Sequence, residues 1–233
     1  MGVARPTIAI GDYRVTTLTN SVFKQNCYVV THEPTQEHLL IDPGMEEPFL
    51  TEQLEAHQMG AIALTHGHFD HVASAEVFGL RFGITAQVHK LEERLVRQAG
   101  TYAFRFARAA VRAPRGLAYF APETSALDWP GHSVQVMATP GHTSGSVSYV
   151  VEGSFVFTGD TLFHSHIGPS NYPESDPAAL KVSVTRLLEG LPEACIIFPG
   201  HGRPWTIGEA RSWWRGLTGP APSYFIFGDT AST

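Results

Sequence analysis

The stretch Thr65-His66-Gly67-His68-Phe69-Asp70-His71 places four potential metal ligands within six residues. The apolar run Ala61–Leu64 before it predicts a buried strand, and Val72–Phe78 after it has the spacing of a helix. Three imidazoles and a carboxylate at the end of a strand can converge on an ion, whereas isolated surface histidines do not. The stretch therefore predicts a metal centre in the loop between this strand and this helix.

Side-chain direction divides the stretch between two cations. In an extended loop the side chains alternate with a period of two residues, so His66 and His68 point the same way and can share one ion. Asp70 and His71, where the chain turns into the helix, point elsewhere and suit a second ion a few ångströms away. We therefore expect two neighbouring metal sites.

Three later segments supply the remaining ligands, because each ends a buried strand in a Gly-containing loop with one polar residue. These segments are Thr139-Pro140-Gly141-His142, Thr158-Gly159-Asp160-Thr161 and Phe198-Pro199-Gly200-His201. The expected ligands are His66, His68 and His142 at one ion and Asp70, His71 and His201 at the other, with Asp160 bridging the two. Five imidazoles and two carboxylates suit zinc, iron or manganese.

This ligand set predicts a hydrolytic chemistry. Two divalent ions can lower the pKa of a bridging water to about 7 and polarise a scissile carbonyl, so no protein nucleophile is needed. Cys27 and Cys195 lie in apolar runs typical of buried thiols. Asp70 is placed to accept or relay a proton once a tetrahedral intermediate forms. We expect metal-assisted hydrolysis of an acyl bond, with Asp70 and Asp160 as the catalytic carboxylates.

The rest of the chain predicts two strand-rich halves, each completed by helices. Strands are expected at Thr7–Ile10, Tyr13–Leu18, Asn26–Val30, His38–Ile41, Thr85–Val88, Val134–Ala138, Val147–Val151, Phe155–Thr158 and Cys195–Phe198. Helices are expected at Glu47–Gln58, at Leu91–Arg112 with a break near Gly100, at Pro177–Leu188 and at Ile207–Leu217. Such halves pack as two sheets face to face with helices outside.

Composition excludes several classes of protein. No apolar run among the 233 residues approaches the roughly 20 that a membrane span needs, and the first residues do not read as a secretory signal. Sixteen basic and 22 acidic residues give a net charge of −6, which disfavours nucleic acid as a partner. We expect a cytoplasmic protein that binds neither membrane nor nucleic acid.

These residues together resemble the metallo-β-lactamase superfamily and, within it, the glyoxalase II-like (hydroxyacylglutathione hydrolase) branch. The family's motifs are matched in order by Asp42 of a strand-end Ile-Asp-Pro-Gly, the run His66–His71, His142, Asp160 and His201. The resemblance implies an α/β fold, a four-layer αβ/βα sandwich of two mixed β-sheets with helices on the outer faces, as a single domain over residues 1–233. It also implies that Asp42 is a buried partner of a ligand imidazole.

The resemblance further implies a hydrolase that uses two divalent ions, foremost zinc with iron or manganese as alternatives, on a thioester or related activated acyl compound. Three other functions stay open: a lactone or ester hydrolase of the same fold, a mononuclear iron persulfide dioxygenase using His66, His142 and Asp160, and a non-catalytic metal-binding module. Relatives usually read Gly-Arg-Ser/Thr-Asp after the bridging Asp, whereas this chain has Gly168-Pro169-Ser170-Asn171.

Residues 90–115 contain seven basic and two acidic side chains, a balance of +5 in a chain of net charge −6. In the superfamily this segment can border the mouth of the active site, where Arg105 and Arg108 could receive an anionic carrier such as coenzyme A or an acyl carrier protein. A helix face solvated by water is the alternative.

Three further side chains are candidate substrate contacts. His164 and His166 follow Asp160 closely and could hydrogen-bond to a substrate. Tyr172 could donate to an oxyanion. The apolar segment Tyr224–Phe227 could cover a neighbour's surface in a homodimer.

Overall fold

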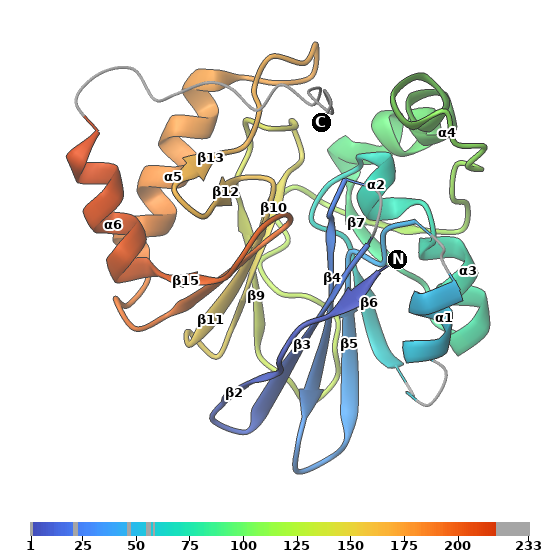
Figure 1. Ribbon diagram of the computed structural model, residues 1–233, viewed down its shortest axis with the longest axis horizontal. Coiled ribbons are helices and arrows are strands. Elements are labelled where there is room, and N and C mark those ends of the chain that lie inside the picture. Colours follow the sequence, from blue (N-terminus) through green and yellow to red (C-terminus); the bar gives the residue numbers. More distant parts are fainter. Residues whose placement is uncertain (1, 21–22, 46–47, 55–56, 58, 218–233) are drawn as a thin grey trace, which may run out of the picture.

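The computed structural model describes residues 2–20, 23–45, 48–54, 57 and 59–217. Two β-sheets pack face to face, and helices cover both outer faces, which gives four layers (Figure 1). The predicted segment Tyr224–Phe227 lies outside the described residues. Among the described helices, none is long and apolar enough to cross a bilayer.

The first sheet is formed by the N-terminal half of the chain. Its eight strands are β1 (Val3–Ala4), β2 (Ile8–Ile10), β3 (Tyr13–Thr19), β4 (Asn26–His32), β5 (Glu37–Ile41), β6 (Met59–Ala63), β7 (Gln87–His89) and β8 (Ala118–Phe120). They lie in the order β1-β3-β4-β5-β6-β7-β8, with β2 paired to β3. Pairing is antiparallel from β1 to β5 and parallel from β5 to β8.

The second sheet comes from the C-terminal half. It contains β9 (Val134–Ala138), β10 (Val147–Val151), β11 (Phe155–Gly159), β14 (Ile196–Pro199) and β15 (Trp205–Thr206), in the order β15-β14-β11-β10-β9. Its β11–β14 pair is parallel and the others are antiparallel, so both sheets are mixed, as expected. A short hairpin of β12 (Leu162–Phe163) and β13 (His166–Ile167) stands beside it.

The helices divide between the two outer faces. They are α1 (Pro48–Leu54), α2 (Phe69–Val72), α3 (Ala75–Phe82), the single 3-10 turn η1 (Lys90–Glu92), α4 (Glu93–Ala107), α5 (Pro177–Gly190) and α6 (Ile207–Gly216). Helices α1, α3 and α4 contribute to the apolar cluster on the outer face of the first sheet. Helices α5 and α6 do the same for the second sheet.

The two-residue period of the central strands sorts their side chains between these layers. In β4, Tyr28 and Val30 point into the core between the sheets, while Cys27 and Val29 point toward the helices. The facing strands of the second sheet fill the same core with Phe155 and other aromatic rings. Because both faces of the central strands are covered, these strands are apolar along their whole length.

One predicted helix was wrong in its details. The segment Leu91–Arg112 forms η1 and then α4, which runs through Gly100 without a break and ends at Ala107. Gly100 is explained by a close approach, since a Cβ atom there would lie 2.7 Å from the Val111 carbonyl oxygen. The helix stops where Arg108 adopts a left-handed conformation, with φ 53°.

Candidate metal centre

The seven predicted ligands come together at one edge of the two sheets. The run His66–His71 follows β6, and the single ligands His142, Asp160 and His201 follow β9, β11 and β14. The first sheet thus supplies four ligands and the second sheet three. A centre at this edge is therefore complete only when both halves of the sandwich are in place.

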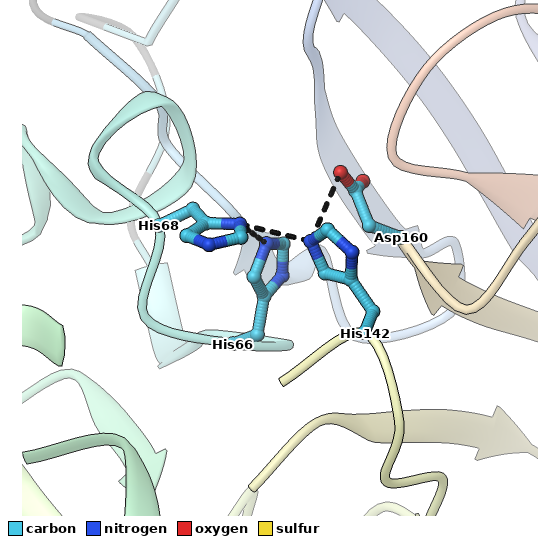
Figure 2. Close-up of side chains that lie close together, drawn as sticks. All are labelled: His66, His68, His142 and Asp160. Carbon is cyan, nitrogen blue, oxygen red and sulfur yellow. Dashed lines mark hydrogen bonds and ion pairs between the residues drawn. The ribbon is translucent and has the colours of Figure 1, made fainter. Parts of the chain in front are cut away.

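His66, His68 and His142 form what we call the three-histidine group. Nδ1 of His68 lies 3.1 Å from Nε2 of His66 and 2.8 Å from Nε2 of His142. Figure 2 shows the three rings turning these nitrogens toward one another, with the carboxylate of Asp160 facing His142. The expectation that His66 and His68 point the same way agrees with this geometry.

The outer nitrogen of each ring decides where its proton lies. Nδ1 of His142 donates to the Pro169 carbonyl oxygen at 2.7 Å, and Nε2 of His68 donates to Oε1 of Glu174 at 3.1 Å. The Thr65 hydroxyl gives its hydrogen to Asp42, so it can only accept from Nδ1 of His66, at 3.1 Å. Burial also lowers the pKa of His66 and of His142, so the inner nitrogen of each of these two rings is unprotonated.

Three imidazole nitrogens that converge this closely can share one cation, and the hydrogen bonds of the outer nitrogens fix the directions of the rings. This arrangement fits a divalent metal ion, since ligating histidines are normally oriented by hydrogen bonds from their other nitrogen.

Asp70, His71 and His201 form the second set, which we call the Asp–His group. Nε2 of His201 lies 3.4 Å from Nε2 of His71 and 3.5 Å from Oδ2 of Asp70. The outer nitrogens are again held by acceptors: Nδ1 of His71 by Oδ2 of Asp42 at 2.9 Å, and Nδ1 of His201 by the Phe23 carbonyl oxygen at 3.0 Å.

Asp160 lies between the two groups. Its Oδ2 is 3.6 Å from Nε2 of His142 and 3.5 Å from Nε2 of His201, so one oxygen reaches both. Its Oδ1 lies 3.3 Å from Nε2 of His71, although without the geometry of a hydrogen bond, and is otherwise buried without a partner among the described residues. A buried carboxylate whose two oxygens face imidazoles of both groups is placed as a bridging ligand would be.

Burial and charge give the two groups opposite protonation. In the three-histidine group, burial and the neighbouring imidazoles lower the pKa of His142 to about 4 and the pKa of His66 well below its usual range. In the Asp–His group, the carboxylates outweigh burial: Asp160 and Asp70 raise the pKa of His201 to about 9 and that of His71 well above its usual range. The metal-free Asp–His group therefore contains protons where an ion would bind.

Asp42 connects the two groups from behind. It is fully buried at the end of β5, and its Oδ1 accepts the Thr65 backbone N–H at 2.8 Å. Its Oδ2 accepts from Thr65 and from His71. Asp42 adopts a left-handed conformation with φ 48°, which Asp tolerates better than most residues. The carboxylate is thus a buried hydrogen-bond partner of His71, one of the candidate ligands.

Glu92 was not predicted from the sequence, yet it contacts two loops of the candidate centre. It is 1% exposed, and its two oxygens accept backbone N–H groups from Gly67 at 2.6 Å and Gly145 at 2.7 Å. It therefore ties the loop of His66 and His68 to the loop that follows His142. A Cβ atom on Gly67 or Gly145 would lie within 2.9 Å of these oxygens, so both positions need glycine.

A signal for Glu92 was available in the sequence. Val96, Ala99 and Ala103 form the buried face of α4, and Glu92 lies four residues before Val96 on the same face. Glu93, one residue on, pairs with Lys90 and Arg97 at the surface. Glu174, the partner of His68, gave no such signal, because it lies in an irregular loop.

The predicted substrate contacts have different positions. The ring of Tyr172 lies 5.5 Å from that of His68, and burial raises the pKa of its hydroxyl to about 12. His164 packs on Trp205 with ring centroids 4.9 Å apart, and Nδ1 of His166 donates to the His164 carbonyl oxygen at 2.9 Å. Tyr172 thus packs edge-on against two rings of the three-histidine group, those of His68 and His142.

Arg105 and Arg108 lie exposed at the C-terminal end of α4. Their guanidinium groups stand over the rings of Phe106 and Phe104, at 5.7 and 5.8 Å from the ring centroids. Both phenylalanines are more than half exposed. The structure therefore presents them as a cationic and aromatic surface.

Comparisons with known proteins agree with this geometry. Residues 20–201 match the family model of the metallo-beta-lactamase superfamily. Hydroxyacylglutathione hydrolase GloC of Haemophilus influenzae is 30% identical over 195 residues, which cover 82% of this chain and 92% of that protein.

Two solved structures are also similar. TTHA1623 in a di-iron-bound form has 34% identity and a TM-score of 0.73, covering 83% of this chain and 95% of that one. The B3 metallo-beta-lactamase BLEG-1 has 28% identity and a TM-score of 0.78, covering 84% and 95%. With the fold and the His/Asp cluster, these matches show that the chain belongs to the metallo-β-lactamase superfamily of metal-dependent hydrolases.

Proposed function

We propose that this protein is a dinuclear, zinc-dependent hydrolase of thioesters or related activated acyl compounds. The observation that supports it best is the position of Asp160, whose Oδ2 lies within 3.6 Å of both His142 and His201. A carboxylate shared by two ligand sets is typical of paired metal ions. Five imidazoles and two carboxylates suit zinc, and the di-iron form of TTHA1623 makes iron the alternative.

When bound, two divalent ions lower the pKa of a water molecule and polarise the scissile carbonyl. The residues of this chain would position and protonate the reactants. His71 and His201 lower the pKa of Asp70 despite its burial, so the carboxylate is ionised at neutral pH and can accept a proton. Tyr172 stays protonated because of its raised pKa, and its hydroxyl would donate to the oxyanion beside the three-histidine group.

The leaving group is proposed to be an anionic thiol carrier, coenzyme A or an acyl carrier protein. Arg105 and Arg108 supply positive charge, and Phe104 and Phe106 supply exposed apolar surface, on the helix that packs beside α2 and its ligands. An anionic carrier with an apolar acyl chain matches both properties. The name of the GloC relative supports an acylated thiol as the substrate class.

Metal analysis together with a hydrolysis screen tests this function. Protein purified without added metal should contain at least two zinc ions, and it should hydrolyse at least one of glutathione, coenzyme A or carrier-protein thioesters faster than lactones and simple esters. A preference for lactones or esters would contradict the thioester assignment. One iron per chain with uptake of oxygen on a persulfide would indicate a dioxygenase using His66, His142 and Asp160. Metal binding without turnover of any substrate would indicate a binding module.

A further inference from the structure

A separate set of imidazole and carboxylate groups lies at the other end of β4. Asn26, at the start of β4, contacts the Pro199 carbonyl beside the candidate centre, whereas His32 ends the same strand. Glu37 begins β5 directly across the turn, which lies at the lower edge of Figure 1. His132, from the segment before β9, completes the set. One ligand atom from each of the three residues lies within 4.8 Å of the others.

Each donor is oriented by a partner behind it. His132 stacks on Trp129 with ring centroids 3.8 Å apart, and its Nδ1 lies 3.2 Å from the Tyr13 hydroxyl. Its Nε2 faces Oε2 of Glu37 at 2.9 Å. The imidazole of His132 is 2% exposed, so its direction is fixed by packing as well as by hydrogen bonding.

The tautomer of His32 follows from its neighbours. The Thr35 hydroxyl donates to Oε2 of Glu37 at 2.9 Å, so it can only accept from Nδ1 of His32, at 2.8 Å. In the neutral ring the lone pair is then on Nε2, which can bind a cation. Such a hydrogen bond from the outer nitrogen is the usual arrangement around a ligating histidine.

The surroundings are negatively charged. Burial, then the carboxylates of Glu152 and Asp12, raise the pKa of Tyr13, which contacts His132. Arg14, the basic group nearby, is paired with Glu33 at 2.9 Å. A local excess of carboxylates favours a bound cation.

We propose that His32, Glu37 and His132 form a third site for a zinc-like divalent cation, separate from the candidate centre. Two imidazoles and one carboxylate are donors that zinc prefers, and the half-exposed Glu37 leaves room for water as a further ligand. In a tetrahedral zinc site the ligand atoms lie about 3.3 Å apart, so Nε2 of His132 and Oε2 of Glu37 separate by only a few tenths of an ångström on binding. The ion joins the β4–β5 turn of the first sheet to the segment that enters the second.

The test counts bound zinc on the full chain. Protein stripped with a chelator is dialysed against micromolar Zn²⁺, and the bound metal is measured for the wild type, for His132→Gln and for Glu37→Gln. Each variant should contain one equivalent less than the wild type, while His57→Gln, a histidine outside this cluster, should match the wild type. Because the readout is a difference, it does not depend on how many ions the candidate centre binds.

Two further measurements complete the test. Thr35→Val keeps all three donors but removes the partner of His32, so zinc affinity at this site should fall about tenfold. Hydrolytic activity should be unchanged in all these variants, so failure of the proposed function would not imitate failure of this site. Glu37 is exposed, so Glu37→Gln should fold even if His132→Gln does not. Equal zinc content in the wild type and in folded Glu37→Gln would overturn the proposal.

Discussion

The three-histidine group and the Asp–His group lie side by side, yet they differ in what they contain before a metal binds. In the first, burial keeps His66 and His142 neutral, so their nitrogens are ready to bind an ion. In the second, the carboxylates keep His71 and His201 protonated, so an ion must displace protons. The same residue type thus has opposite charge in two adjacent sites because of its neighbours.

Opposite protonation predicts that the two groups bind their ions in separate steps. The three-histidine group should bind its ion first, over a wide range of pH. The Asp–His group should bind less tightly as the pH falls below about 9, where His201 becomes protonated. Asp160 couples the two steps, since its carboxylate reaches both groups.

The largest effect is expected when the link between the two groups is removed. Asp160→Asn keeps the shape of the side chain but removes the charge that both groups share. We expect kcat/KM on the best thioester to fall by about a thousandfold or more. Asp176→Asn, at the exposed N-terminus of α5, is the matched control and should retain activity. A loss of less than tenfold in Asp160→Asn would contradict a bridging role.

Removing one ligand of the Asp–His group should separate the two groups. Asp70→Ala should lose one of the two zinc ions of the candidate centre and lower kcat by about a hundredfold, since the proton acceptor is lost together with the ion. The zinc ion of the three-histidine group should remain. Metal analysis and steady-state kinetics on the same sample check this. Full activity with a single metal ion would exclude the dinuclear mechanism.

The variant Glu92→Gln tests whether zinc binding by the three-histidine group depends on the hydrogen bonds that Glu92 accepts from the two loops. In Glu92→Gln one backbone N–H, of Gly67 or Gly145, loses its acceptor, so the free energy of unfolding should fall by about 1–3 kcal/mol. Zinc affinity of the three-histidine group should fall about tenfold or more. Urea unfolding and zinc titration measure the two effects.

Glu93→Gln is the control for Glu92→Gln. Glu93 is the next residue in the chain, but its carboxylate pairs with Lys90 and Arg97 at the surface. It should change neither quantity measurably. Equal behaviour of the two variants would show that the buried carboxylate does not support the metal-binding loops.

The opposite protonation of the groups predicts a maximum in the stability of the metal-free protein. His201, with its raised pKa, binds a proton in the folded state. Its contribution to the free energy of unfolding is therefore complete below pH 6.5 and is lost as the pH rises through about 9. His142, with a pKa of about 4, must stay neutral, so stability also falls below pH 6.5. Urea midpoints from pH 5 to 9.5 should therefore peak near neutrality.

Bound zinc should remove the loss of stability at alkaline pH, because the ion replaces the protons of the Asp–His group. The comparison is made between chelated and zinc-loaded samples at each pH. Metal-free stability that stays level from pH 6.5 to 9 would contradict the protonated state of His71 and His201.

The smallest effect on activity is expected for the two arginines at the exposed C-terminal end of α4. The double variant Arg105→Ala with Arg108→Ala should raise KM for a coenzyme A or carrier-protein thioester several-fold, and leave a neutral ester unaffected. The ligands lie elsewhere, so kcat should not change. Steady-state kinetics on the paired substrates decide the matter. Equal effects on both substrates would exclude the docking role.

The convergence of the seven candidate ligands could be predicted because its signal is local. All of them follow an apolar strand, five of the seven adjoin a glycine, and the two-residue period placed His66 and His68 together. The orienting partners could not be predicted in this way. The Pro169 and Phe23 carbonyl oxygens are main-chain atoms from distant segments, which leave no mark on residue type.

The strands and helices also divide into those with a local signal in the sequence and those without one. The long strands β3, β4 and β10 contain enough alternating or continuous apolar residues to be recognised, and their bounds differ little from the predicted ones. The two-residue strands β12 and β15 are too short to show a period. The helix break near Gly100 was wrong because a glycine that permits a tertiary contact looks identical, in sequence, to one that ends a helix.

The hydrogen bonds from His142 and His201 to carbonyl oxygens have an evolutionary consequence. Every residue type offers a carbonyl group, so substitutions at Pro169 or Phe23 can change the side chains around the opening without removing the acceptors. Such anchoring lets substrate preference diversify among descendants while the ion-binding geometry is inherited intact.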